Sequence, residues 1–280
     1  DSGVFHAIRA SVARYKDSPD NMTGRVFLPA LRYLTDRGRH GWINAVWPRS
    51  ENEGLFRSLA PEQEDEVLAS MVICPNIDHN AEQILKAIAA KSPEKVIDFF
   101  GKRLAHEKGL QSSRGYDEVP YEFHDLRETL QKIPEQLVAK VREWFASDNE
   151  LFAYRGGRMI AAVFPEPEDQ LLKPLHELAG TGKLDDVEFV IAVLKNYHGQ
   201  VVLHDLFKDL IAALSEGSPL LGEISVALDS AGVVAGEFGH VATYLRKKDE
   251  IKPWLDDPRE KVRAFAHNQT LGLERQIADE

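Results

Sequence analysis

Apolar residues recur at three- and four-residue spacing along most of the chain, as in Val96, Phe99 and Phe100. This spacing places them on one face of a helix. No stretch of six residues alternates strictly between apolar and polar positions, so the sequence gives little support to strands. The pattern therefore predicts an all-α protein. The expected helices span residues 66–74, 81–90, 92–107, 121–132, 134–146, 149–164, 167–179, 184–197, 201–215, 220–230, 238–248 and 259–277.

The dipeptide Pro-Glu recurs at the start of successive apolar segments, with steps of 32, 41 and 33 residues. Its prolines are Pro61, Pro93, Pro134 and Pro167. Proline at the first helical position loses no hydrogen bond, and the carboxylate behind it faces the positive end of the helix dipole. The same helix start repeated at roughly 30–45 residues is typical of stacked helical repeats.

Residues Leu255–Ala266, with the sequence LDDPREKVRAFA, resemble the inter-helix turn and second-helix opening of a HEAT repeat. In this interpretation Asp257 caps the helix and Pro258 takes its first position. The small side chains of Ala264 and Ala266 would allow a neighbouring helix to approach closely. Weaker echoes occur at Leu184–Val190 and Trp144–Phe152.

The resemblance to HEAT/armadillo-like repeats implies a right-handed α-α superhelix with an extended concave surface that holds other macromolecules. A looser similarity of style, in Gly41–Trp47, Leu55–Ala60 and Val96–Phe100, is to the C-terminal helical-repeat sensor regions of large bacterial proteins. Those proteins include STAND-type NTPases that serve in defence. This similarity implies an upstream domain in the same chain.

The net charge of −11 is distributed unevenly over the 280 residues. Residues 1–50 hold eight Lys/Arg against four Asp, whereas the remainder holds 26 Lys/Arg against 41 Asp/Glu. We therefore expect a basic helical segment over 1–50, acting as a cap or docking region, and HEAT-like repeats over 51–280. An acidic body argues against a nucleic-acid groove along its length, because phosphate neutralisation dominates that affinity.

The single cysteine, Cys74, excludes an internal disulfide and a Cys-based zinc site, which favours the cytoplasm. No apolar run approaches the roughly 18 residues of a membrane span, so we expect no membrane contact. The ten histidines lack metal-ligand spacing, and Gly180-Thr-Gly-Lys183 lacks the first glycine and the Ser/Thr of a phosphate-binding loop. We expect no metal, no cofactor and no catalytic residues.

The first fifty positions interleave arginines with aromatic residues, a composition that suits single-stranded nucleic acid or an acidic protein surface. The candidate binding residues there are Arg25, Arg32, Arg37, Arg39, Trp42, Trp47 and Arg49. Three alternatives remain open. The tryptophans could pack in the first repeat, the basic residues could seat an upstream domain, or they could pair with the acidic body.

Arg155-Gly-Gly-Arg158 interrupts an apolar helical segment. Each glycine costs about 1 kcal/mol relative to alanine, which a sequence tolerates for close packing or a kink. Alternatively, Arg155 and Arg158 could hold a phosphate or carboxylate bidentately.

Together these features predict a non-enzymatic recognition or scaffold module that binds a protein partner. Two alternatives come from other classes. One is a nucleic-acid-binding solenoid that uses the arginine-rich N-terminal segment. The other is an enzyme like the HEAT-like DNA glycosylases, which should be basic along the concave face, whereas this body is acidic.

Overall fold

The computed structural model describes residues 2–17, 23–46, 53–110, 115–147, 149–229 and 239–279. Over these ranges the protein is helical with no β-strand, which confirms the all-α prediction. The chain divides into two compact units, Asp1–Trp144 and Phe145–Glu280. The boundary expected near residue 50 falls inside the first unit, between described residues 46 and 53.

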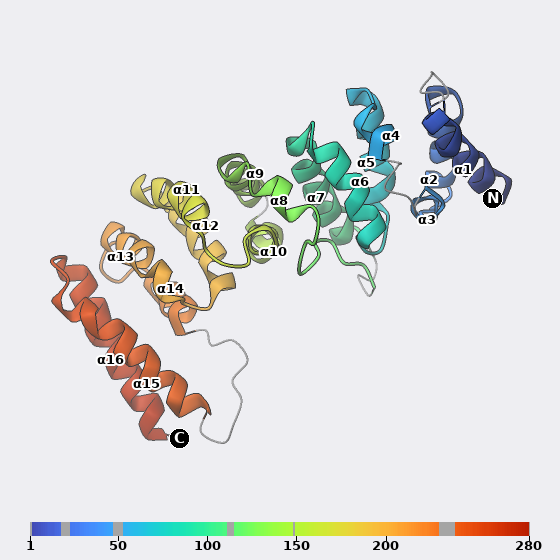
Figure 1. Cartoon of the computed structure of the whole chain (residues 1–280). Helices are drawn as coiled ribbons and strands as arrows, with labels where there is room; N and C mark the ends of the chain where they lie inside the picture. Colours follow the sequence, from blue (N-terminus) through green and yellow to red (C-terminus); the bar gives the residue numbers. More distant parts are fainter. Residues whose placement is uncertain are drawn as a thin grey trace. The chain divides into compact units, whose positions relative to one another are not determined.

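The first unit contains both short helices and helices of three or more turns (Figure 1). They are α1 (Ser2–Asp17), α2 (Leu28–Thr35), α3 (Trp42–Val46), α4 (Glu53–Arg57), α5 (Pro61–Val72), α6 (His79–Ala89), α7 (Pro93–Lys108), α8 (Arg127–Leu130) and most of α9 (Pro134–Ser147), within which the boundary falls, with a π-helical turn, Thr23–Phe27, before α2. Helices α5, α6 and α7 pack against one another, while α2 contacts α5 and α3 contacts α6. The N-terminal helices are therefore part of the same core as α4–α6.

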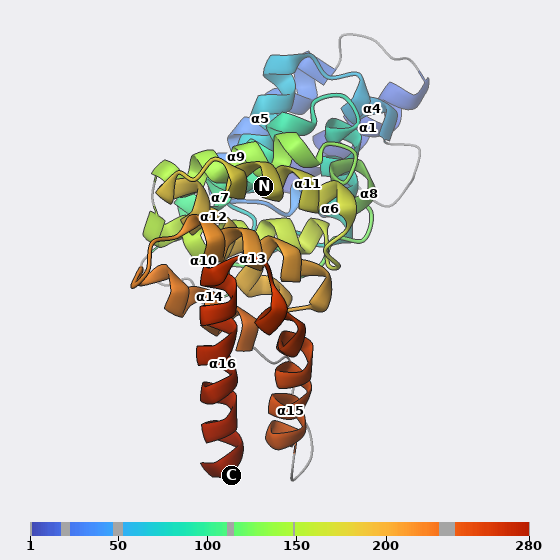
Figure 2. The same cartoon turned by 90° about the vertical axis from the view of Figure 1, so that its left-hand side faces the viewer.

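The second unit contains α10 (Asn149–Val163), α11 (Asp169–Gly180), α12 (Leu184–Leu194), α13 (His204–Ala213), α14 (Leu220–Asp229), α15 (Gly239–Ile251) and α16 (Glu260–Asp279), with 3₁₀ turns at Lys195–Tyr197, Val201–Leu203 and Lys252–Asp256. Helix α12 packs against both α10 and α14, and α13 packs against both α11 and α16. Helices α15 and α16 lie side by side as a hairpin (Figure 2). Helices α10, α11, α12 and α13 thus each contact a helix at least two elements further along the chain.

The Pro-Glu dipeptides begin three of the four helices expected. Pro61, Pro93 and Pro134 are the first residues of α5, α7 and α9. Pro167 is different, because α11 begins at Asp169 and Glu168 keeps an extended backbone at its N-cap. The carbonyl of Glu168 accepts the first helical N–H groups, so the proline lies outside the helix.

The HEAT-like segment also starts its helix later than the sequence predicts. Helix α16 begins at Glu260, so Pro258 precedes it rather than taking the first position. Asp257 instead accepts the N–H of Arg259 at 3.0 Å and forms an ion pair with its guanidinium, which holds the turn before the helix. Ala266 is buried as expected, whereas Ala264 is exposed and lines a groove.

The largest difference concerns residues 121–132, where the pattern predicts a helix. Only α8 is helical there, and residues 115–126 form an irregular loop. The apolar side chains that suggested a helix are nevertheless buried, including Phe123, which packs at 5.2 Å between ring centroids against Phe100. The backbone of this loop is hydrogen-bonded to side chains from α6 and α7, which replace the bonds a helix would make internally.

Candidate functional site

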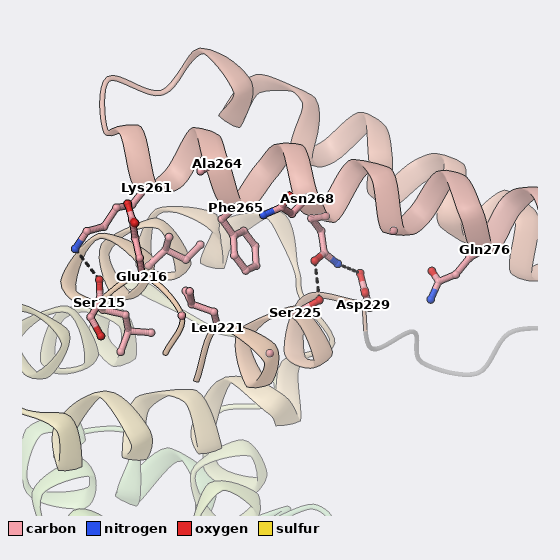
Figure 3. Close-up of a pocket in the computed structure, with 16 residues that line it drawn as sticks. Ser215, Glu216, Leu221, Ser225, Asp229, Lys261, Ala264, Phe265, Asn268 and Gln276 are labelled. Atoms are coloured by element: carbon pink, nitrogen blue, oxygen red, sulfur yellow. Dashed lines mark hydrogen bonds between the residues drawn. The ribbon is translucent and has the colours of Figure 1, made fainter. Parts of the chain in front are cut away.

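A groove of about 740 Å³ lies in the second unit between α14 and α16 (Figure 3). The end of α13 and the turn that follows it close one side. Ile211, Leu214, Leu221 and Phe265 make its lining apolar, and Phe265 points from α16 towards α14. We call this feature the α14–α16 groove.

Hydrogen bonds hold the two walls together at one end of the groove. The Ser225 hydroxyl on α14 donates to Oε1 of Gln269 on α16 at 2.6 Å. The amide nitrogen of Gln269 donates in turn to Oδ1 of Asp229 at 2.6 Å. Gln269 is almost fully buried, so these bonds form away from competing water. Burial raises the pKa of Asp229, an effect that the bond from Gln269 opposes.

A lysine ties α16 to α13 at the other end. The ammonium group of Lys261 donates to the carbonyl oxygens of Ala212 at 3.2 Å and Leu214 at 2.6 Å. These carbonyls belong to the C-terminal turn of α13, which has no further helical donors to satisfy them. The spacing between α13, α14 and α16 is therefore fixed by bonds at both ends of the groove.

Two helical glycines line the groove without any packing reason for being glycine. Gly222 lies in the first turn of α14 and Gly272 in the interior of α16. A Cβ atom built at either position meets no heavy atom of the described residues within 4 Å. Glycine in a helix interior costs about 1 kcal/mol relative to alanine. Close contact between helices therefore does not require glycine at either position.

The glycine at position 157 shows the opposite situation. A Cβ atom there would lie 2.4 Å from Nδ2 of Asn196 and 2.9 Å from the carbonyl oxygen of Ala192. Helix α10 runs without interruption through this glycine and packs against α12. The close-packing interpretation of the Gly-Gly pair is thus confirmed at Gly157.

The groove offers binding groups but no assembled catalytic group. Asn268 and Gln276 present side-chain amides from α16, while Glu216 and Lys261 contribute charges near the α13 end (Figure 3). No cluster of three His, Cys, Asp or Glu suited to a metal occurs among the described residues. Such a site can bind a ligand through apolar contact and neutral hydrogen bonds.

Cys74, the single cysteine of the chain, lies in the core of the first unit. It is a free thiol, 1% exposed, and burial raises its pKa to about 12. A thiol in that state is a poor nucleophile, since the thiolate is the reactive form. Cys74 is therefore a core residue of the first unit.

Arg25, Arg32, Arg37 and Arg39 lie on or near α2, and they do not share a surface with Trp42, which is buried. Arg25 and Arg39 are exposed. Arg32 binds Glu66 of α5 through two contacts of 2.5 and 2.7 Å, and this hydrogen bonding raises its pKa. The guanidinium of Arg37 lies 3.7 Å from the ring centroid of Tyr33.

Trp42 is fully buried, with its ring centroid 6.1 Å from that of Phe27. It is unavailable for stacking on a nucleic-acid base. The prediction that Trp42 lies on a binding surface is therefore wrong. Ile43 and Val46 are buried on the same short helix, which agrees with the alternative that this tryptophan packs in the core. Trp47 and Arg49 lie outside the described residues.

Arg155 and Arg158 lie on α10, half-buried. Burial lowers the pKa of Arg155, and the nearby charge of Arg158 lowers it further. Neighbouring cationic side chains attract an anion. Anion binding by Arg155 and Arg158 stays a prediction.

The sequence analysis missed the α14–α16 groove entirely. The one signal available was a glycine inside an otherwise regular helical pattern, as at Gly272. The burial of two polar side chains in the first unit, Glu82 and Arg103, which are 3% and 0% exposed, was not predicted either.

Compared with protein family models, with characterised proteins and with solved structures, the chain gives no significant match to any of them. The described helices include none whose length and hydropathy would suit a bilayer crossing. Function therefore has to be argued from the geometry.

Proposed function

We propose that this protein is a non-enzymatic recognition module of HEAT-like helix pairs that binds a polypeptide segment of a protein partner in the α14–α16 groove. The repeats would stack as a right-handed superhelix. The proposal also includes the setting that the sequence suggests, namely the C-terminal sensor or interaction region of a larger, cytoplasmic bacterial protein.

The observation that carries the proposal is the open space beside Gly272 and Gly222. A side chain at position 272 would strengthen α16 at no packing cost, since glycine is the less favourable residue there by about 1 kcal/mol. Proteins accept such losses at binding sites, where a ligand backbone must approach closely.

The chemistry of the lining favours a polypeptide as the occupant. A peptide carries one donor and one acceptor per residue together with apolar side chains. The amides of Asn268 and Gln276 supply both a donor and an acceptor, and Leu221 and Phe265 supply apolar contact. A charged metabolite would instead call for several convergent charges, and the groove offers only a few, at its ends.

The nucleic-acid alternative finds less support in the structure than in the sequence. That alternative depended on aromatic residues and arginines near the N-terminus. Of these, Trp42 is buried, and Arg32 already binds Glu66. For the enzyme alternative, the described residues hold no group of three His, Cys, Asp or Glu that could bind a metal, and the thiol of Cys74 is buried.

The test is a selection of random twelve-residue peptides displayed on phage, carried out against the whole chain. Peptides that bind the groove should lose binding to Gly272→Leu, whose side chain occupies the open space. They should retain binding to Gly180→Leu, because Gly180 ends α11, away from the groove, and a Cβ there also meets nothing within 4 Å.

Thermal denaturation gives the control for folding. Gly272→Leu should melt at or above the temperature of the wild-type protein, because leucine is the better helix former. A selection whose peptides bind Gly272→Leu and the wild type equally would refute the groove as the binding site.

A further inference from the structure

The loop formed by residues 115–126 of the first unit, between α7 and α8 (Figure 1), is irregular in backbone but fixed at both ends. Most surface loops are held only by their flanking elements. This one is anchored by two buried polar side chains, a guanidinium from α7 and a carboxyl group from α6.

The first anchor is Arg103 of α7, whose side chain is fully buried. Its Nε donates to the carbonyl oxygen of Glu118 at 2.9 Å, and Nη2 donates to that of Asp117. Nη1 donates to the carbonyl of Cys74 at 2.7 Å, which joins the loop to the end of α5. The guanidinium also lies 4.6 Å from the ring centroid of Tyr116.

The second anchor is Glu82 of α6, which is 3% exposed. One carboxylate oxygen accepts the backbone N–H groups of Asp125 at 2.6 Å and Leu126 at 2.7 Å. The side chain of Asp125 is held in turn by Gln83 and by Lys86 at 3.4 Å. Bonds of this charge-assisted kind are among the strongest that a loop can make.

Between these anchors the loop exposes Tyr121. Its side chain is 82% exposed, the largest fraction of any large apolar residue in the described part of the chain. Tyrosine is enriched among the residues that dominate protein interfaces. A ring on a loop that is already rigid loses little conformational entropy on binding, so it is well suited to recognition.

The charges beside the ring indicate what it would bind. Residues 115–126 contain four carboxylates and no lysine or arginine. Glu122, the next residue along the chain, has a side chain that is 60% exposed and contacts Arg127 at 2.7 Å. Such an exposed ion pair is weak and can exchange its arginine for another. A guanidinium stacks on an aromatic face and binds a carboxylate bidentately, which ammonium groups do less well.

We propose that Tyr121 and Glu122 form a docking site for an arginine side chain on a basic segment of a protein partner. The site is independent of the α14–α16 groove and lies in the other unit of the chain.

The test uses the whole chain labelled with 3-fluorotyrosine, with the resonance of residue 121 assigned from its loss in Tyr121→Phe. The probes are two peptides, acetyl-GGRGRGG-amide and the same peptide with lysine in place of arginine. The arginine peptide should shift this resonance saturably and bind about threefold or more tightly than the lysine peptide. No shift, or equal affinity for the two peptides, would overturn the proposal.

Fluorescence anisotropy with a labelled arginine peptide adds the variants. Tyr121→Ala should weaken binding at least severalfold, whereas Tyr121→Phe keeps the ring and should retain most of it. Tyr33→Ala, which removes a ring that is 38% exposed on α2, is the matched control and should leave binding unchanged. A loss equal to that of Tyr121→Ala would mean that binding does not depend on the ring at position 121 in particular, which contradicts the proposal.

The two proposed sites can fail separately. Gly272→Leu should leave the arginine-peptide titration unchanged, and Tyr121→Ala should leave peptides selected for the groove unaffected. Saturable displacement of the arginine peptide by oligo(dT) at residue 121 would instead identify a nucleic-acid site and overturn the proposal for a protein partner.

Discussion

The α14–α16 groove and the 115–126 loop are built in opposite ways. The groove has open space where Gly272 lacks a side chain. The loop is held by hydrogen bonds from the side chains of Arg103 and Glu82. Substitution should therefore raise stability in the first region and lower it in the second. A surface feature can therefore be formed in two ways. Omitting a side chain lowers stability, whereas burying a polar side chain that hydrogen-bonds the backbone raises it.

The largest expected effect is at the loop anchor. Arg103→Met should lower the free energy of unfolding by about 3 kcal/mol or more, because several buried carbonyl oxygens lose their donor together. Urea denaturation of the full chain measures this. Arg127→Met, which removes a more exposed arginine of the same loop region, should change stability by less than about 0.5 kcal/mol. Equal losses in the two variants would show that Arg103 is not an anchor.

The second anchor should give a smaller and more local effect. Glu82→Gln keeps an acceptor oxygen but weakens two charge-assisted bonds, so we expect a loss of about 1–2 kcal/mol. Hydrogen exchange at the amides of Asp125 and Leu126 should accelerate at the same time. Glu128→Gln, at an exposed position of α8, serves as the control. Unchanged exchange at both amides would argue against anchoring by Glu82.

The groove should respond in the other direction. Gly272→Ala should raise the free energy of unfolding by about 0.5–1 kcal/mol, since alanine restricts the unfolded chain and meets no obstruction. Gly157→Ala is the matched comparison and should lower it by about 1–3 kcal/mol, because its Cβ atom collides with Asn196. A shift of the denaturant concentration at the unfolding midpoint in the same direction for both variants would contradict this prediction.

The smallest effect concerns the carboxylate at the groove end. The folded pKa of Asp229 is raised by burial, so its contribution to stability is lost as pH rises from the unfolded pKa through the folded one. Asp229→Asn keeps the acceptor for Gln269 and removes the charge. It should stabilise the protein at pH 7 by a fraction of the roughly 1.4 kcal/mol that one pKa unit represents. Denaturation midpoints of both proteins at pH 3.5 and 7 should differ only at pH 7.

The helices could be predicted because their signals are local. Spacing of apolar residues located nearly every element from α5 onward, and Pro61, Pro93 and Pro134 marked helix starts. The pattern failed at residues 121–126, where Phe123 and Leu126 are buried as a helix would require, but the backbone donors bind Glu82 instead. No local pattern shows that a carboxylate some 43 residues earlier accepts those bonds.

The sites were much less predictable than the fold. Arg32 and Arg37 were expected on a binding surface. In the folded chain Arg32 binds Glu66 and the guanidinium of Arg37 lies over the ring of Tyr33, and the sequence pattern did not indicate these contacts. Trp42 looked like a stacking residue and is core. Gly157 and Gly272 look alike in the sequence, and only the atoms around each one separate a packing contact from an open groove.

The sequence by itself determined that this chain is all helical, where most of its helices begin, and that its body is acidic. These properties depend on spacing, caps and composition, which act within a few residues. The tertiary structure alone decided which glycine opens a groove, which arginine is buried and which tyrosine is displayed. Those outcomes depend on contacts between residues far apart in the chain, whose partners no local pattern specifies.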